Sequence, residues 1–144
     1  MNNINYILNK DINSISFGAE NSDITLSQDM IMSAIHKTNS TIDKVGGVEG
    51  VDIFEILGMR NLSAFMGELF VSCIVNSSEG LLRKNPHQDG YPDLLAMTKD
   101  GILLWEKLSQ NLKDKSPFSP FETGGLEVKA TCGAVPTPAA LAKK

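Results

Sequence analysis

Two short apolar segments, each beside acidic residues, constrain the fold of this chain most strongly. One follows Asp93 directly, and the other spans Leu126 to Thr131. Both are short, apolar and bounded by Gly, Pro or Asp, which is typical of β-strands. Because successive side chains of a strand point to opposite faces, the pattern predicts that Glu127 and Lys129 share one face. The sequence therefore predicts a sheet with an acid and a base side by side.

These charged groups have a chemical use if the two strands are neighbours. The carboxylates of Asp93 and Glu127 can then converge on one divalent cation, with the Lys129 ammonium near a phosphate or a water. Metal-assisted hydrolysis of phosphate esters uses this set of groups. The residues also allow a simpler interpretation, in which Asp93 follows a turn proline and Glu127 and Lys129 form a solvated ion pair on an edge strand.

The sequence around these residues resembles a known motif. Pro92-Asp93 followed by Glu127-Val128-Lys129 resembles the PD-(D/E)XK nuclease motif, and the flanking GYPDLLA and GLEVKAT are most similar to type II restriction endonucleases. The resemblance implies an α/β fold with a restriction-endonuclease-like core, which is a mixed central sheet flanked by helices. It also implies Mg²⁺-dependent hydrolysis of phosphodiester bonds in double-stranded DNA at a specific sequence. Asp93 and Glu127 would be the metal ligands, and Lys129 would orient or activate the attacking water.

A third acidic residue comes from an expected helix. Apolar residues recur at intervals of three and four from Leu62 to Val75, which predicts a helix that packs on the sheet, capped by Asn61 or Ser63. In the family resembled, the helix before the metal-binding strands often carries a glutamate that helps to ligate the metal. Glu68 is the residue that matches, and the alternative is an ordinary solvated glutamate, because position alone does not fix which way it faces.

The remaining segments carry weaker signals. Residues 25–45 predict a helix with Ser27 as its N-cap, whereas residues 1–24 are polar and form either a loose N-terminal arm or a short hairpin. Lys99-Asp100-Gly101 is a turn signal, after which we expect a returning strand and a short helix. A basic loop with Arg83, Lys84 and His87 precedes Asp93 and either contacts a DNA backbone or is simply solvated.

Length and charge limit the number of domains and the kinds of partner that we expect. The chain of 144 residues is expected to form one nuclease-core domain over 1–144. It lacks a long apolar stretch and the features of a signal peptide, so we expect a cytoplasmic protein without a membrane partner. The net charge of −4 argues against indiscriminate coating of nucleic acid, although a local basic groove can still bind phosphates. Little sequence follows Lys129 to close such a sheet, so we expect the amino-terminal portion of a longer enzyme.

By resemblance to restriction enzymes, the full-length enzyme would be a homodimer with two sites on opposite DNA strands. Two other functions stay open at this stage. One is a DNA repair or recombination nuclease of the same fold. The other is a non-catalytic DNA-binding or assembly module, whose acidic residues would only form surface ion pairs.

Overall fold

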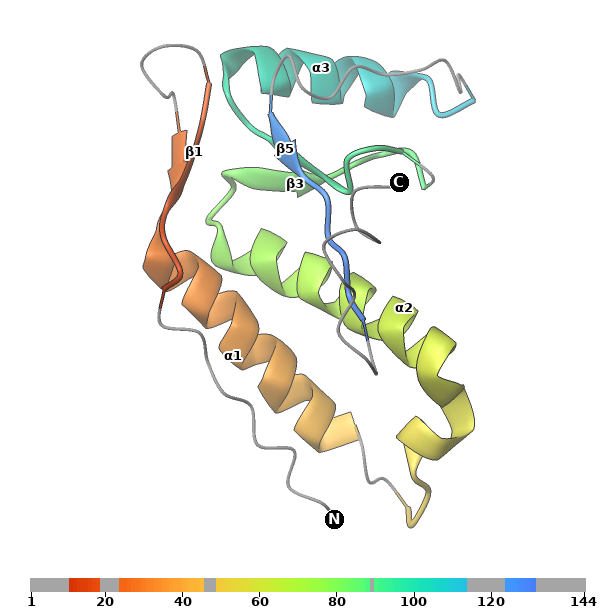
Figure 1. The fold of residues 1–144 in the computed structure, drawn as a ribbon. Helices are drawn as coiled ribbons and strands as arrows, with labels where there is room; N and C mark the ends of the chain where they lie inside the picture. Colours follow the sequence, from red (N-terminus) through yellow and green to blue (C-terminus); the bar gives the residue numbers. More distant parts are fainter. Residues whose placement is uncertain (1–10, 19–23, 46–48, 89, 114–123, 132–144) are drawn as a thin grey trace, which may run out of the picture.

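The computed structural model describes residues 11–18, 24–45, 49–88, 90–113 and 124–131, which form three helices and two small sheets (Figure 1). The elements in chain order are β1 (Ile15–Phe17), β2 (Ile24–Leu26), α1 (Gln28–Val45), α2 (Ile53–Ser77), β3 (Leu82–Lys84), β4 (Leu94–Ala96), α3 (Lys99–Gln110) and β5 (Gly125–Leu126). The expected combination of helices and strands is confirmed. The described strands all pair antiparallel, as the hairpin β1-β2 and the sheet β3-β4-β5, so a mixed sheet is not what they form.

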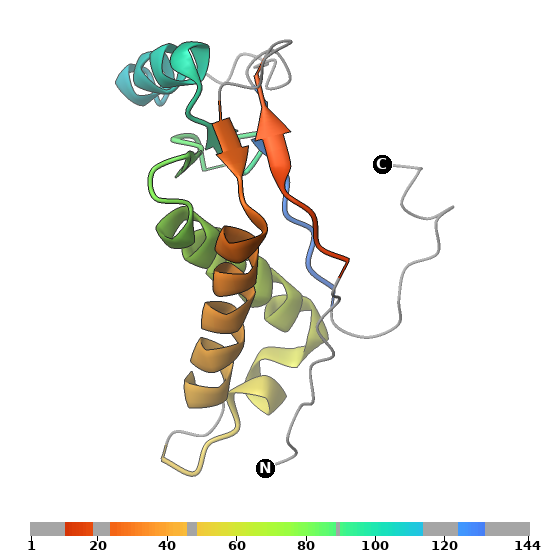
Figure 2. The same cartoon turned by 90° about the vertical axis from the view of Figure 1, so that its left-hand side faces the viewer.

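The three-stranded sheet lies between α3 and the pair formed by α1 and α2 (Figures 1 and 2). Its buried side chains pack against α1, α2 and the hairpin. The core consists of Phe17, Leu26, Ala34, Val71, Ile74, Leu82, Leu94 and Ala96. Burial of each of the larger aliphatic side chains stabilises the fold by about 1.5–3 kcal/mol. Of the described helices, none is both long and apolar enough to cross a membrane.

The start of α1 follows the prediction closely. The Oγ of Ser27 accepts a hydrogen bond from the backbone N of Met30 at 3.2 Å, which confirms Ser27 as the cap. The helix begins at Gln28 and not at residue 25, because residues 24–26 pair with β1. Of the two alternatives for residues 1–24, the described part forms a hairpin, because residues 15–17 pair with residues 24–26. Residues 1–10 and 19–23 lie outside the described residues.

Helix α2 is longer than its apolar stripe predicts. Asp52 caps it by accepting a hydrogen bond from the backbone N of Phe54 at 2.9 Å. Neither Asn61 nor Ser63 is a cap, because both lie inside the helix. Gly58 has φ 64° and ψ 170°, a conformation that is open almost only to glycine, and it kinks the helix near its start.

Helix α3 begins where a tight turn was expected. Thr98 caps it by accepting a hydrogen bond from the N of Gly101 at 3.0 Å, so Lys99-Asp100-Gly101 is the first helical turn and no returning strand follows. Gly101 is required for another reason: a Cβ at this position would collide with the carbonyl oxygen of Ala96. The glycine thus allows close packing of α3 on the end of β4.

Candidate active site

Asp93 is held at the start of β4 by the neighbouring strand and loop. The backbone N of Asn85, which follows β3, donates to the carbonyl of Asp93 at 2.8 Å. The buried Asn85 side chain donates from Nδ2 to the carbonyl of Pro92 at 3.0 Å and accepts from the N of His87 at 3.0 Å. Asn85 therefore fixes the loop that leads into Asp93. The sequence interpretation missed it, although an asparagine before a proline is a turn signal and its side chain typically bonds the backbone two residues on.

The segment that carries Glu127 is placed by β5. Strand β5 pairs antiparallel with β4, with Leu126 opposite Leu94 and Gly125 opposite Leu95. A Cβ on Gly125 would collide with the carbonyl oxygen of Leu94, so glycine is needed for this close pairing. The strand ends at Leu126, and Glu127 to Lys129 follow it, although we expected them within it.

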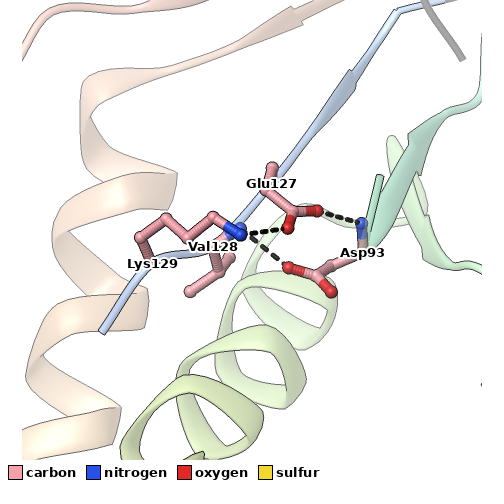
Figure 3. Close-up of polar contacts among 4 residues, drawn as sticks. All are labelled: Asp93, Glu127, Val128 and Lys129. Carbon is pink, nitrogen blue, oxygen red and sulfur yellow. Dashed lines mark hydrogen bonds and ion pairs between the residues drawn. The ribbon is translucent and has the colours of Figure 1, made fainter. Parts of the chain in front are cut away.

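Two hydrogen bonds join Asp93 to this segment (Figure 3). The backbone N of Asp93 donates to Glu127 Oε2 at 3.2 Å, and the backbone N of Val128 donates to Asp93 Oδ2 at 2.8 Å. We call this pair of bonds the carboxylate clasp. It brings two acidic side chains together from segments that are distant in sequence, as the expected pairing of their strands requires.

Lys129 is the third charged residue beside Asp93 and Glu127, and it pairs with Glu127. Its Nζ lies 2.6 Å from Glu127 Oε1. This hydrogen bond, together with the negative charges of Glu127 and Asp93, raises the pKa of Lys129 above its ordinary value, although partial burial opposes the shift. The ammonium therefore keeps its proton at neutral pH and acts as a hydrogen-bond donor.

Glu68 lies on the same pocket as Asp93 and Lys129. The pocket has a volume of about 260 Å³, and its wall on the α2 side includes Gly67, Glu68 and Val71. Glu68 is thus one of the residues that line the pocket, and its side chain is 69% exposed. Its Oε2 lies 2.8 Å from the Nζ of Lys84, so the glutamate forms an ion pair with a lysine of β3.

The basic residues predicted in a loop are arranged differently. Arg83 and Lys84 belong to β3, and their side chains take different partners. The guanidinium of Arg83 lies 4.8 Å from the centroid of the Trp105 ring on α3, whereas Lys84 reaches Glu68 on α2. Of these two basic residues, Lys84 is therefore the one that pairs with a residue lining the pocket.

The donor set suits a hard divalent cation. Carboxylate oxygens are the ligands that Mg²⁺ prefers, and Mg²⁺ usually takes one or two carboxylates and keeps several waters. Asp93 uses Oδ2 for Val128 and carries a second oxygen, Glu127 adjoins it, and Glu68 lines the same pocket. Within the described residues, however, no three acidic, histidine or cysteine side chains are close enough to form a ready-made metal cluster. A cation would thus be held by few protein ligands, with water completing its coordination.

No family model, curated protein or solved structure matches this chain. The assignment of a function therefore depends on the residues and the geometry of the site.

Proposed function

We propose that this chain carries the active site of a type II restriction endonuclease with a restriction-endonuclease-like core, which hydrolyses phosphodiester bonds of double-stranded DNA with Mg²⁺. The observation that carries the proposal is the meeting of Asp93, Glu127 and Lys129 at the carboxylate clasp. The motif is widely spaced in sequence, and its chemistry needs these three side chains in one place. A chance occurrence of the motif gives no reason for them to meet.

Each residue has a distinct part in the proposed reaction. Asp93 and Glu127 would hold Mg²⁺, and Glu68, which lines the same pocket as Asp93, would be a further ligand. When bound, Mg²⁺ would polarise the phosphate and lower the pKa of a bound water. The carboxylate clasp fixes Asp93 through backbone bonds, so its position does not depend on the cation.

Lys129 acts as a cation and not as a base. Its raised pKa keeps the ammonium protonated, so it donates a hydrogen bond to the attacking water or to a phosphate oxygen and stabilises developing negative charge. Its side chain is 68% exposed, so a substrate phosphate can reach it. Because the net charge of the chain is −4, phosphate binding depends on such local lysines.

Two other functions fit parts of the same geometry. A repair or recombination nuclease would use the same residues but would cut by structure or by ends, giving a smear of plasmid DNA where a restriction enzyme gives discrete bands. A non-catalytic module is favoured by one observation: Glu68 and Glu127 both form ion pairs with lysines, as surface acids often do. Titration with Mn²⁺ separates this module from a nuclease, since only a metal site binds the ion measurably.

The central experiment is cleavage of supercoiled plasmid with Mg²⁺ by the full-length protein, which we propose to act as a homodimer. Asp93→Asn is expected to abolish cleavage and Mn²⁺ binding, whereas Lys129→Met is expected to abolish cleavage and leave Mn²⁺ binding largely intact. A gel-shift assay with Ca²⁺ in place of Mg²⁺ tests whether each variant still binds DNA.

Lys37→Met is a matched control, because Lys37 is an exposed lysine of α1 whose Nζ donates to Asn76 Oδ1 at 2.6 Å. It should cleave as the wild type does. Cleavage at the wild-type rate by Asp93→Asn or Lys129→Met would show that the proposed site is wrong.

A further inference from the structure

Lys84 forms an ion pair with Glu68, which lines the same pocket as Asp93 and Lys129. We propose that Lys84 is a positioning residue that competes with the divalent cation for Glu68, holding this glutamate while the metal is absent and releasing it when the metal binds. This inference rests on the proposed function. It adds that Lys84 regulates how strongly the site binds the metal.

The backbone of Lys84 is fixed next to the site. Lys84 pairs with Leu94 in the β3-β4 ladder, one residue along from Asp93. Its carbonyl oxygen accepts a hydrogen bond from Trp105 Nε1 at 3.0 Å. The strand pairing and this bond hold the main chain between β4 and α3, so a change of partner involves the flexible side chain of Lys84 and not its backbone.

The ion pair itself is exposed on both sides. The Lys84 side chain is 58% exposed and that of Glu68 is 69% exposed. Exposed ion pairs are weak, because water screens the attraction and both side chains lose conformational freedom. A divalent cation carries twice the charge of an ammonium, so it can displace Lys84 from Glu68 at a small energetic cost.

The other two carboxylates are held differently. Asp93 accepts a backbone hydrogen bond from Val128, and Glu127 accepts one from Asp93. The Glu68 carboxylate pairs instead with the Nζ of Lys84, which belongs to a flexible side chain. Lys84 is therefore the group whose removal should most directly change the availability of Glu68 to a metal.

Calorimetric titration of the full chain with Mn²⁺, without DNA, tests this inference. Lys84→Met removes the charge and keeps most of the side chain, so the dissociation constant for Mn²⁺ should fall by about three- to tenfold. Lys84→Arg keeps a cation and should bind Mn²⁺ as the wild type does. Lys37→Met, which removes a lysine bonded to an amide, should leave Mn²⁺ binding unchanged.

A second background separates competition for Glu68 from a general effect of charge. In Glu68→Gln, the additional Lys84→Met substitution should give no further gain in Mn²⁺ affinity, because the group for which the two cations compete is gone. An equal gain in both backgrounds, or no gain in either, would overturn the inference. Fluorescence of Trp105 reports whether each variant keeps the native contact between α3 and β3.

The same titration distinguishes failure of this inference from failure of the proposed function. If the wild type binds no Mn²⁺, or if Asp93→Asn binds it equally well, the proposed metal site is refuted. If Asp93→Asn loses Mn²⁺ binding and Lys84→Met changes nothing, only the role of Lys84 is refuted.

Discussion

Two substitutions of Asp93 separate what its carboxylate contributes to folding from what it contributes to chemistry. Asp93→Ala removes the acceptor and the charge together, whereas Asp93→Asn removes the charge and keeps an acceptor oxygen of similar shape. Both should lose the affinity for Mn²⁺, because the ligand charge is gone in each. They should differ in the free energy of unfolding.

The size of this difference follows from one hydrogen bond. Asp93 Oδ2 accepts from the N of Val128 at 2.8 Å in a partly buried environment. Loss of the acceptor leaves this N–H without its partner, which costs about 1–3 kcal/mol. Asp93→Ala should therefore be destabilised by about 1–3 kcal/mol and Asp93→Asn by less than about 1 kcal/mol. The bond from the Asp93 backbone N to Glu127 is retained in both variants.

Urea unfolding followed by Trp105 fluorescence measures the effect, since Trp105 is the one tryptophan of the chain. The buffer must contain a chelator, because a metal that binds only the folded state raises apparent stability. Equal midpoints for the two variants, or a wild-type midpoint for Asp93→Ala, would show that the bond to Val128 does not hold the segment after β5.

Three further predictions concern the surroundings of the site and can be checked by the same unfolding assay. Gly58→Ala should lose about 1–3 kcal/mol, because φ 64° and ψ 170° suit glycine alone, whereas Gly67→Ala in the same helix should be neutral or stabilising by up to about 1 kcal/mol, since its new methyl meets only ordinary contacts. Asn85→Ala should lose about 1–3 kcal/mol, because two hydrogen bonds to backbone groups of the loop are lost; wild-type stability would refute its role in holding that loop. The raised pKa of Lys129 means that its pairing with Glu127 stabilises the fold below the ordinary lysine pKa and is lost as the pH rises through the raised value. Lys129→Met should therefore show a smaller loss of stability at alkaline pH than the wild type, and identical pH profiles would contradict this.

The sequence predicted the local features that short-range rules determine. Alternation along an extended segment placed Glu127 and Lys129 together, and their ion pair agrees with this prediction. Ser27 was recognised as a cap because its side chain acts within one helical turn. The apolar stripe located the part of α2 that packs on the core, including Phe70, Cys73 and Ile74.

Features that depend on distant contacts were missed. Lys99-Asp100-Gly101 contains the residues of a turn, but the Thr98 cap and close packing on Ala96 make it a helix start. The antiparallel pairing of β5 with β4, and its end at Leu126, are set by contacts between segments that sequence periodicity does not report. The partnership of Lys84 with Glu68 likewise joins a strand to a helix, and no spacing rule predicts it.

The contacts that position Asp93 and Glu127 also balance the charge of the carboxylates around them. Asp93 and Glu127 lie side by side at the carboxylate clasp, and like charges at short range repel. Lys129 offsets this repulsion by pairing with Glu127. Lys84 pairs with Glu68 and balances its charge in the same way. The backbone bonds of the carboxylate clasp set the position of Asp93, while the lysine pairs balance the remaining charge. In the proposed site, metal binding would therefore require only that Lys84 leave Glu68, at side chains that are both exposed, with no rearrangement of the sheet.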